Sequence, residues 1–261
     1  MIKTKPRLSV VLATFNEAKN LPRCLDSVAN LADEIIVVDG RSADQTVSIA
    51  KKYGAKVKLT DNRPNFHINK NLAIDMAKGD WLLQLDADEV VSKPLSERIR
   101  KIIRTPGGPD GYWLPRLNYF LGRPLTKGGQ YPDYTLRLYR NGAGRLPAKD
   151  VHEQAVVKGE VAYLSEDLLH FNTPDFENYL LRHNRYTSLL AGQLGEKHLS
   201  LGLASAVNYL FWQPVKEFFS LYFRHRGYVD GFPGFVFAFF SGLRFAVAYI
   251  KYWQKILYPA V

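Results

Sequence analysis

The sequence predicts an α/β fold, with an open and mainly parallel sheet in the first part of the chain and a helical region at the end. Between residue 8 and about residue 90, short apolar runs rich in β-branched residues alternate with segments of helical periodicity. The last third is also helical in its periodicity, but it becomes increasingly apolar and aromatic. These observations place a layered α/β unit before a helical one.

Four strands are expected in the first ninety residues, most of them followed by a helix. The expected strands are residues 8–15, 34–40, 56–61 and 81–86, and the expected helices are residues 17–29, 47–53 and 67–79. Asn16 is placed to cap the first helix, Ser42 to cap the second, and Gly79 to end the third. Strands that alternate with such helices pair in parallel through crossover connections.

The alternation stops after one further helix, which begins at Pro94. Extended segments are expected at residues 112–122, 135–141 and 155–165, the last as a possible hairpin. Strands without helices between them suggest an antiparallel appendage laid over the mouth of the first sheet. We expect one domain over residues 1–170, with halves at about 1–105 and 106–170, and a helical region over residues 171–261.

Composition narrows the class of protein. With 261 residues, 46% hydrophobic and 23% charged, the chain has the composition of a globular protein and is long enough for a real core. A single cysteine, Cys24, excludes an internal disulfide, a cysteine-based zinc cluster and a CxxC redox pair. The formal net charge of +10 indicates an anionic partner, which is nucleic acid, anionic lipid or a phosphorylated substrate.

Polar residues follow three of the predicted strands, and they are expected to meet at one edge of the sheet. They are Thr14 to Glu17, Asp39 to Ser42, and Asp86, Asp88 and Glu89. Asp86 and Asp88 point the same way from an extended backbone, and such oxygen ligands suit Mg²⁺ or Mn²⁺ carrying a diphosphate. The alternative is an acidic loop that caps the next helix.

Glycine-rich phosphate loops are missing, since the sequence has neither GxGxxG nor GxxxxGK[ST]. A diphosphate would therefore be held by a metal and by basic residues, and Arg137 and Arg140 are the candidates. Their spacing puts them on opposite faces of a strand, so they are not expected to do the same work. Either residue could instead lie on a solvated strand edge.

Three motifs in a fixed order resemble the nucleotide-sugar-binding half of family 2 glycosyltransferases, which have a GT-A fold. They are LSVVLATFNEAKNL (8–21), IIVVDGRSADQT (35–46) and GDWLLQLDADE (79–89). Three further motifs are similar to a subgroup that includes bacterial lipopolysaccharide-core glucosyltransferases: YPDYTLRLYRNGAGR (131–145), KDVHEQ (149–154) and RGYVDGFPGF (226–235). The resemblance implies a GT-A catalytic domain, with a nucleotide-binding half at about 1–105 and an acceptor half at about 106–170.

The resemblance also implies roles for individual residues. The donor-binding set is Thr14, Phe15, Asn16, Glu17, Asp39, Asp86, Ala87 and Asp88, with Asp39 bonded to the base and Asp86 and Asp88 holding the ribose and the metal-bound diphosphate. A carboxylate at Asp39 can accept from the imide N–H of uracil, although Asp39 could instead cap the next helix. Lys70 and Asn71 could touch the donor, or their helix could be scaffold.

Inverting sugar transfer needs a metal for the leaving diphosphate and a base for the acceptor hydroxyl. Glu153 is the preferred base, because the resemblance aligns the KDVHEQ segment near the active site, and Asp133 is the second choice. His152 could add a metal ligand beside Asp86 and Asp88, or it could be structural. The function predicted is transfer of a sugar, most simply glucose, from a UDP-sugar to a lipid-linked glycan such as the inner-core heptose of lipopolysaccharide.

The last third favours a membrane surface. Residues 203–223 are amphipathic, and residues 232–250, with Arg244 as their one charge, approach membrane-crossing length. The basic and aromatic flanks are Arg224, His225, Arg226, Lys251, Trp253, Lys255 and Tyr258. We expect peripheral or monotopic association with anionic lipid at the cytoplasmic face of the bacterial inner membrane, because no export signal is found. A true span and packing within the protein or a dimer are the alternatives.

Two other functions are compatible with these residues. A polyprenyl-phosphate sugar synthase would use a phosphate acceptor, which has less need of a base. A non-catalytic basic module would bind membrane or nucleic acid, but converging acidic residues would repel a polyanion, so no nucleic-acid partner is expected.

Overall fold

The structure is a computed structural model that describes residues 7–147, 154–173 and 175–258. The chain divides into two compact units. The sheet unit contains residues 1–116 and 133–170, and the helical unit contains residues 117–132 and 171–261. The sequence pattern had placed residues 117–132 in the first domain, whereas the contacts group them with the C-terminal helices.

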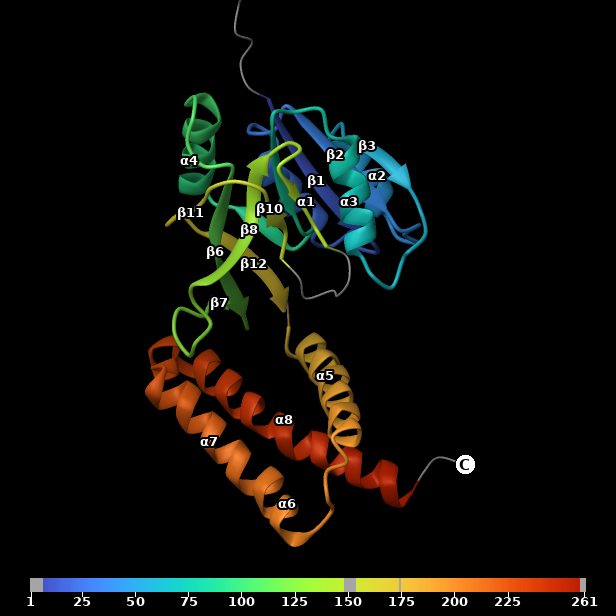
Figure 1. Ribbon diagram of the computed structural model, residues 1–261, viewed down its shortest axis with the longest axis vertical. Helices are drawn as coiled ribbons and strands as arrows, with labels where there is room; N and C mark the ends of the chain where they lie inside the picture. The colour runs from blue at the N-terminus through green and yellow to red at the C-terminus, as the bar shows by residue number, and fades with distance from the viewer. Residues whose placement is uncertain (1–6, 148–153, 174, 259–261) are drawn as a thin grey trace, which may run out of the picture. The chain divides into compact units, whose positions relative to one another are not determined.

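The sheet unit is built on a large mixed sheet (Figure 1). Its parallel part has the order β3-β2-β1-β4, made of β1 (Leu8–Thr14), β2 (Glu34–Asp39), β3 (Lys56–Leu59) and β4 (Trp81–Leu85). Beyond β4 the order continues as β8-β6-β12-β5, with β8 (Asp133–Arg140), β6 (Gly111–Phe120), β12 (Leu168–Thr173) and β5 (Glu89–Val91). β7 (Arg123–Pro124) and β11 (Val161–Tyr163) pair with β6, and β9 (Gly144–Arg145) pairs with β10 (Val156–Val157).

The later strands extend the first sheet, which corrects the expectation of an appendage over its mouth. β8 pairs antiparallel with β4, with Leu138 opposite Leu83, so it covers the backbone edge that β4 would otherwise leave open. The expected hairpin at residues 155–165 is also wrong. β10 pairs with β9 instead, and β11 runs parallel to β6.

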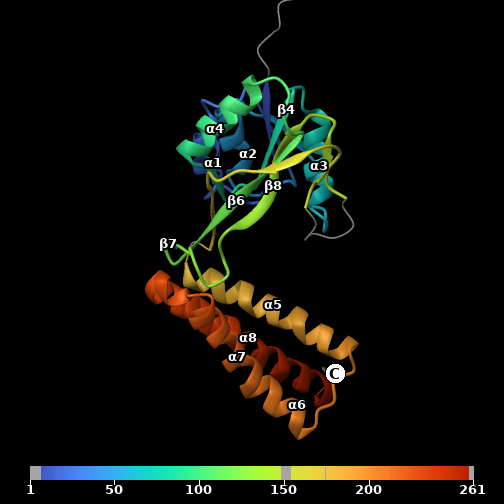
Figure 2. The same ribbon diagram turned by 60° about the vertical axis from the view of Figure 1, so that its left-hand side comes forward.

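Helices cover both faces of the parallel strands β1, β2 and β4, which explains why these three strands are almost entirely buried. Figure 2 shows α3 on one side of the sheet and α1, α2 and α4 on the other. Along β1, Val10 belongs to the core on the α1 side and Val11 to the core on the α3 side. These helices are α1 (Leu21–Val28), α2 (Thr46–Lys52), α3 (His67–Met76) and α4 (Lys93–Arg104). The predicted α/β class is confirmed.

The helical unit consists of α5 (Phe176–Glu196), α6 (Leu203–Val207), α7 (Gln213–Phe219) and α8 (Gly231–Leu257), with π-helical turns η1 (Asn208–Trp212) and η2 (Ser220–Arg224) and a 3₁₀ turn η3 (Gly227–Asp230). α8 packs against both α5 and α7. Within the described residues, one helical stretch, 227–257, is long and apolar enough to cross a membrane by length and composition.

A carboxylate explains why residues 117–132 belong to the helical unit. Asp230 accepts hydrogen bonds from the Thr126 backbone N–H at 3.0 Å, the Thr126 hydroxyl at 2.6 Å and the Lys127 backbone N–H at 2.9 Å. The loop before β8 is thereby fixed to the turn before α8, about a hundred residues further along the chain.

Candidate functional site

The ends of β1 and β2 are joined through the side chain of Asp39. This buried carboxylate accepts from the Thr14 hydroxyl at 2.8 Å, the Ser42 hydroxyl at 2.6 Å and the Ser42 backbone N–H at 2.7 Å. Asp39 therefore caps the turn that follows its own strand, and it lies at the predicted edge of the sheet.

The loops after β1 and β2 are joined by reciprocal hydrogen bonds. Asn16 and Ser42, which were predicted to cap α1 and α2, make these bonds instead. Asn16 has a left-handed backbone with φ of 55°, and its side-chain oxygen accepts from the Ala43 N–H at 2.8 Å. The Ser42 hydroxyl accepts from the Asn16 N–H at 2.8 Å. Because Asn16 and Ser42 bind the opposite loop, α1 and α2 begin four residues beyond them or later. Phe15, between these bonds, is 43% exposed.

Asp86 lies just beyond the end of β4 and is held by two cations. It forms an ion pair with the Lys70 ammonium from α3, and its Oδ2 accepts from the Arg137 guanidinium of β8 at 2.5 Å. Burial raises the pKa of Asp86, but Arg137 and then Lys70 outweigh this effect and hold its pKa well below the ordinary value. Asp86 is therefore an ionised carboxylate with a fixed orientation.

Glu89 contacts both Asp86 and Arg137. The sequence analysis had given this residue no separate role. It is completely buried, and its Oε1 accepts from Arg137 at 2.7 Å while its Oε2 accepts from the Asp86 N–H at 2.9 Å. Arg116 lies 3.6 Å from the same Oε1 and binds Asp133 at 2.7 and 2.9 Å. The result is a chain of alternating charges, called the charge network below: Lys70, Asp86, Arg137, Glu89, Arg116 and Asp133.

A cavity of about 220 Å³ opens onto the charge network. Its lining residues are Phe66, His67, Lys70, Asp86, Arg116, Thr135, Arg137, Leu146, Gln154 and Ala155. Three of these side chains are cationic and one is anionic. The Lys70 ammonium also lies 4.7 Å from the centre of the Phe66 ring. The cavity is therefore suited to a small, highly charged anionic group.

Asp88 lies beside this network and close to a histidine that sequence reasoning missed. Its Oδ2 is 3.5 Å from Nε2 of His170, a buried residue of β12. The contact could not be predicted from local sequence, because His170 lies in a strand about eighty residues further along the chain. Among the described residues, no group of three or more His, Cys, Asp and Glu is arranged to hold a metal ion. Glu153 and His152, the predicted base and metal ligand, lie outside the described residues.

Arg140 is not brought to this edge, which corrects its assignment to the donor site. It pairs with Trp81, at the opposite end of β4 from Asp86. Its guanidinium lies 4.6 Å from the centre of the Trp81 ring and 3.2 Å from the Asp110 carboxylate. Arg137 enters the charge network, whereas Arg140 stays outside it.

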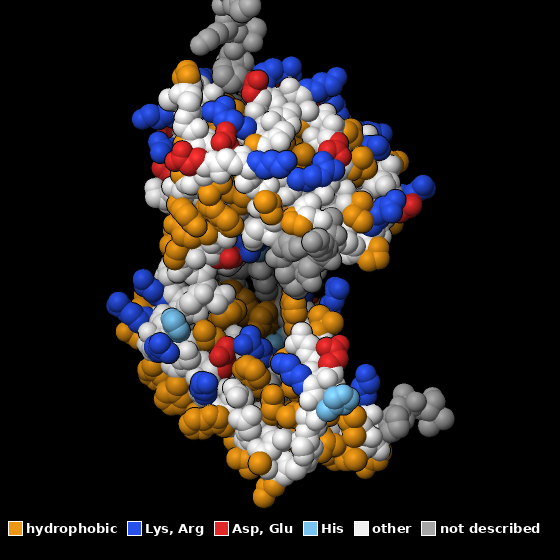
Figure 3. All heavy atoms as spheres, in the orientation of Figure 1, with side chains coloured by type: hydrophobic (Ala, Val, Ile, Leu, Met, Phe, Trp, Pro, Cys, Tyr) orange, Lys and Arg blue, Asp and Glu red, His pale blue; other side chains and the backbone are white. Residues whose placement is uncertain are grey.

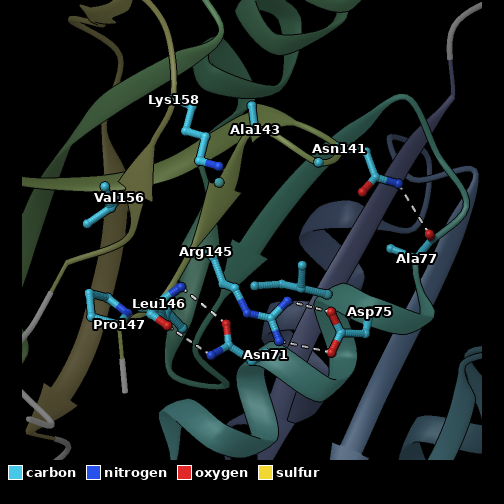
Figure 4. A pocket seen from close by; sticks show the side chains of 13 residues that line it. Asn71, Asp75, Ala77, Asn141, Ala143, Arg145, Leu146, Pro147, Val156 and Lys158 are labelled. Carbon is cyan, nitrogen blue, oxygen red and sulfur yellow. Dashed lines mark hydrogen bonds and ion pairs between the residues drawn. The ribbon is translucent and has the colours of Figure 1, made fainter. Parts of the chain in front are cut away.

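Asn71 faces a second cavity, of about 660 Å³, on the far side of Leu146 (Figure 4). Its amide nitrogen donates to the Leu146 carbonyl at 2.9 Å, and its oxygen accepts from the Leu146 N–H at 3.1 Å. An ion pair of Arg145 and Asp75 crosses the same cavity at 2.6 Å. Because both polar atoms of its side chain bind the Leu146 backbone, the geometry favours a structural role for Asn71 over contact with the donor.

Comparison with known proteins relates the chain to one family. Residues 9–151 match the profile described as Glycosyl transferase family 2. The chain is 31% identical over 261 residues to an uncharacterized glycosyltransferase of Rickettsia bellii (strain RML369-C), with 92% of this chain and 85% of the relative covered. It is 28% identical over 250 residues to the lipopolysaccharide core biosynthesis glycosyltransferase LpsC of Rhizobium meliloti (strain 1021), with 91% of each chain covered.

Two solved structures are also similar. S. aureus TarS 1–349 in complex with UDP has a TM-score of 0.46 at 18% identity, over 94% of this chain and 88% of that one. Glucosyl-3-phosphoglycerate synthase from Mycobacterium tuberculosis, in complex with Mn²⁺, UDP and glucosyl-3-phosphoglycerate, has a TM-score of 0.37 at 25% identity, over 44% of each chain.

Proposed function

Because the chain belongs to glycosyltransferase family 2, we propose that it moves a sugar from a UDP-sugar to a lipid-linked glycan. Membership rests on a profile match over more than half of the chain and on a relative that covers nearly all of it. It confirms the resemblance found in the sequence, with the GT-A fold that the resemblance implied. Sugar transfer follows from membership, whereas the donor, the acceptor and the metal are the proposal.

The observation that carries the proposal is the cation-lined cavity at the end of β4. The leaving group in transfer from a nucleotide sugar is a diphosphate, whose charge grows as the glycosidic bond breaks. Lys70, Arg116 and Arg137 line the space in which such a charge would be stabilised. Asp86, held by two of these cations, is oriented to bind a ribose hydroxyl. Thr14 to Glu17 and Asp39 complete the proposed nucleoside pocket.

A divalent cation, Mg²⁺ or Mn²⁺, fits the corner at Asp88. The Asp88 side chain is 21% exposed and its Oδ2 lies 3.5 Å from Nε2 of His170, and a carboxylate oxygen suits either Mg²⁺ or Mn²⁺. Asp86 fits less well as a ligand, because Lys70 and Arg137 already hold its oxygens. When bound, the cation would supply positive charge for the departing diphosphate. His152 stays a proposed additional ligand.

Glu153 is proposed as the base that takes the proton of the acceptor hydroxyl. The second choice, Asp133, is engaged by Arg116 through two hydrogen bonds at 2.9 and 2.7 Å. Both bonds end on Oδ2, so Asp133 is held by a cation, and Glu153 stays the preferred base on the resemblance of the KDVHEQ segment. The base must lie on the acceptor side of the sugar, and Glu153 directly precedes Gln154 in the sequence, a residue that lines the cavity.

Glucose is the proposed sugar, and an inner-core heptose of lipopolysaccharide is the proposed acceptor. The support is the resemblance of the second-half motifs and the similarity to a relative named for lipopolysaccharide core biosynthesis. An acceptor of this kind is anchored in a lipid leaflet. We accordingly propose an anionic membrane surface, at the cytoplasmic face of the inner membrane, as the place of action.

The test is a donor panel with purified full-length protein. UDP-sugars and GDP-sugars are compared with and without Mn²⁺, and released nucleotide is measured. Turnover of UDP-glucose that needs Mn²⁺ and disappears in Asp88→Ala is expected, while the control Asp75→Ala, whose carboxylate pairs with Arg145 outside the charge network, keeps it. Faster turnover of every GDP-sugar, or full activity in Asp88→Ala, would overturn the proposal.

A further inference from the structure

The helical unit exposes a row of apolar side chains that recur every four residues from α6 to η2. We call it the four-residue stripe: Leu203, Val207, Phe211, Val215, Phe219 and Phe223. Each of them is between 50% and 82% exposed, and Trp212 beside them is 62% exposed. Single exposed apolar residues are ordinary, but a continuous row on one surface marks an interaction site.

Two π-helical turns keep this row on one face. An α-helix has 3.6 residues per turn, so a spacing of four drifts by about 40° at each step and by about 200° over five steps. Each π turn takes up one extra residue. The Gln213 N–H bonds to the Asn208 carbonyl in η1, and the His225 N–H to the Ser220 carbonyl in η2, both five residues back. The twenty residue-to-residue steps from Leu203 to Phe223 therefore make about five turns, one for each interval of the stripe.

The opposite side of the segment from α6 to η2 packs against α8. Gly242 lies so close to α7 that a Cβ placed there would be 2.5 Å from the Pro214 carbonyl oxygen. Small buried residues recur along α8 at Gly234, Ala238, Gly242 and Ala246, and this seam permits close helix packing. An ion pair of Arg244 with Glu217 at 2.8 Å fastens the two helices. α8 therefore packs against α7 along this seam, while Phe232, Phe235 and Phe239 of the same helix remain 71%, 39% and 47% exposed.

The charges around the stripe favour an anionic surface. The helical unit has eleven Lys and Arg residues against five Asp and Glu residues. Between residues 203 and 223 the charged residues are Lys216, which is exposed, and Glu217, which Arg244 neutralises. Arg224, His225 and Arg226 follow the stripe directly and are exposed. Figure 3 shows apolar side chains over this unit with Lys and Arg among them.

We infer that the four-residue stripe enters the interfacial layer of an anionic lipid leaflet while the basic residues at its end bind the headgroups. Aromatic side chains flanked by arginine are typical of such interfaces. A second copy of the chain carries the same excess of positive charge, so an anionic lipid surface is the better electrostatic match for this face. This inference rests on the proposed lipid-linked acceptor, and it names the stripe as the contacting element.

The test compares two double variants of the full-length protein in vesicle sedimentation. Phe211→Ser with Phe219→Ser changes the stripe, and Leu181→Ser with Leu189→Ser changes residues of α5 that are 64% and 55% exposed. Vesicles of phosphatidylcholine with phosphatidylglycerol are compared with phosphatidylcholine alone. We expect the stripe variant to bind the anionic vesicles at least about tenfold more weakly, from the lost apolar area, and the α5 variant to bind as the wild type does.

A second measurement covers the case in which the stripe variant does not fold. Quenching of tryptophan emission by brominated anionic lipid should fall sharply in Trp212→Phe and persist in Trp253→Phe. Equal vesicle binding by both double variants, quenching that survives in Trp212→Phe, or a dimer that only the stripe variant loses in analytical ultracentrifugation would each overturn the inference. Release of UDP from UDP-glucose is measured in parallel. Its absence in all proteins, with the vesicle result intact, would overturn the donor assignment and still support the stripe.

Discussion

Glu89→Gln is the substitution whose effect the structure defines most closely. It removes one negative charge from the centre of the charge network and keeps the side-chain shape. The buried Arg137 guanidinium then faces Asp86 alone, and an amide nitrogen can take the place of an oxygen that accepts at 2.7 or 2.9 Å. Breaking a buried ion pair by removing one partner costs about 3–5 kcal/mol. Because Asp86 still pairs with Arg137, we expect the lower end, roughly 3 kcal/mol of unfolding free energy.

The assay is urea denaturation at neutral pH, followed by circular dichroism and tryptophan fluorescence. Glu97→Gln is the matched control, since Glu97 is exposed on α4 and its loss should change the unfolding free energy by less than about 0.5 kcal/mol. Donor turnover should fall as well, because Glu89 fixes Arg137 and the backbone at Asp86. If Glu89→Gln were as stable as Glu97→Gln, the charge network would not hold this edge of the sheet together.

Three further predictions follow from individual groups. Glu153→Gln should abolish transfer to a sugar hydroxyl and leave Mn²⁺-dependent binding of UDP, measured by calorimetry, unchanged; mild loss of transfer would favour a phosphate acceptor. Burial raises the pKa of Glu34, but hydrogen bonds from Lys56, Ser9 and the Lys78 backbone bring it down to about 2, so this carboxylate stabilises the fold above its ordinary pKa of 4.5. That contribution is lost as pH falls towards 2, and the stability difference between wild type and Glu34→Gln, from denaturation at each pH, should shrink over that window. Burial and then the charges of Glu89, Asp88 and Asp86 raise the pKa of the Cys24 thiol, so Cys24 should react with a disulfide reagent at pH 8 only in urea, and fast reaction of the native protein would contradict its position.

Local sequence predicted the strands of the parallel sheet well and the first turns of the helices poorly. Runs such as residues 35–38 are apolar on both faces, and this pattern needs no knowledge of the partner strand. Asn16 and Ser42 have the chemistry of helix caps, but their side chains bind each other's loops across about 26 residues. No local pattern distinguishes these two uses of the same side chain.

The candidate site was predictable where strand ends determine it and unpredictable where distant strands meet. Asp39, Asp86 and Asp88 follow strands of the parallel sheet, and the rule for ligand sites in such sheets points to them directly. His170 and Glu89 contribute through β12 and β5, which pair with each other only in the completed fold. Arg140 was misplaced for a similar reason, because its position depends on which end of β8 lies beside the end of β4.

The chain passes between the two units three times, after residues 116, 132 and 170. A chimaera that exchanges only the segment after residue 170 would therefore keep a foreign loop at residues 117–132, and it would lose the carboxylate at position 230 that holds Thr126 and Lys127. Exchanging the helical unit as an intact body calls for moving both segments together.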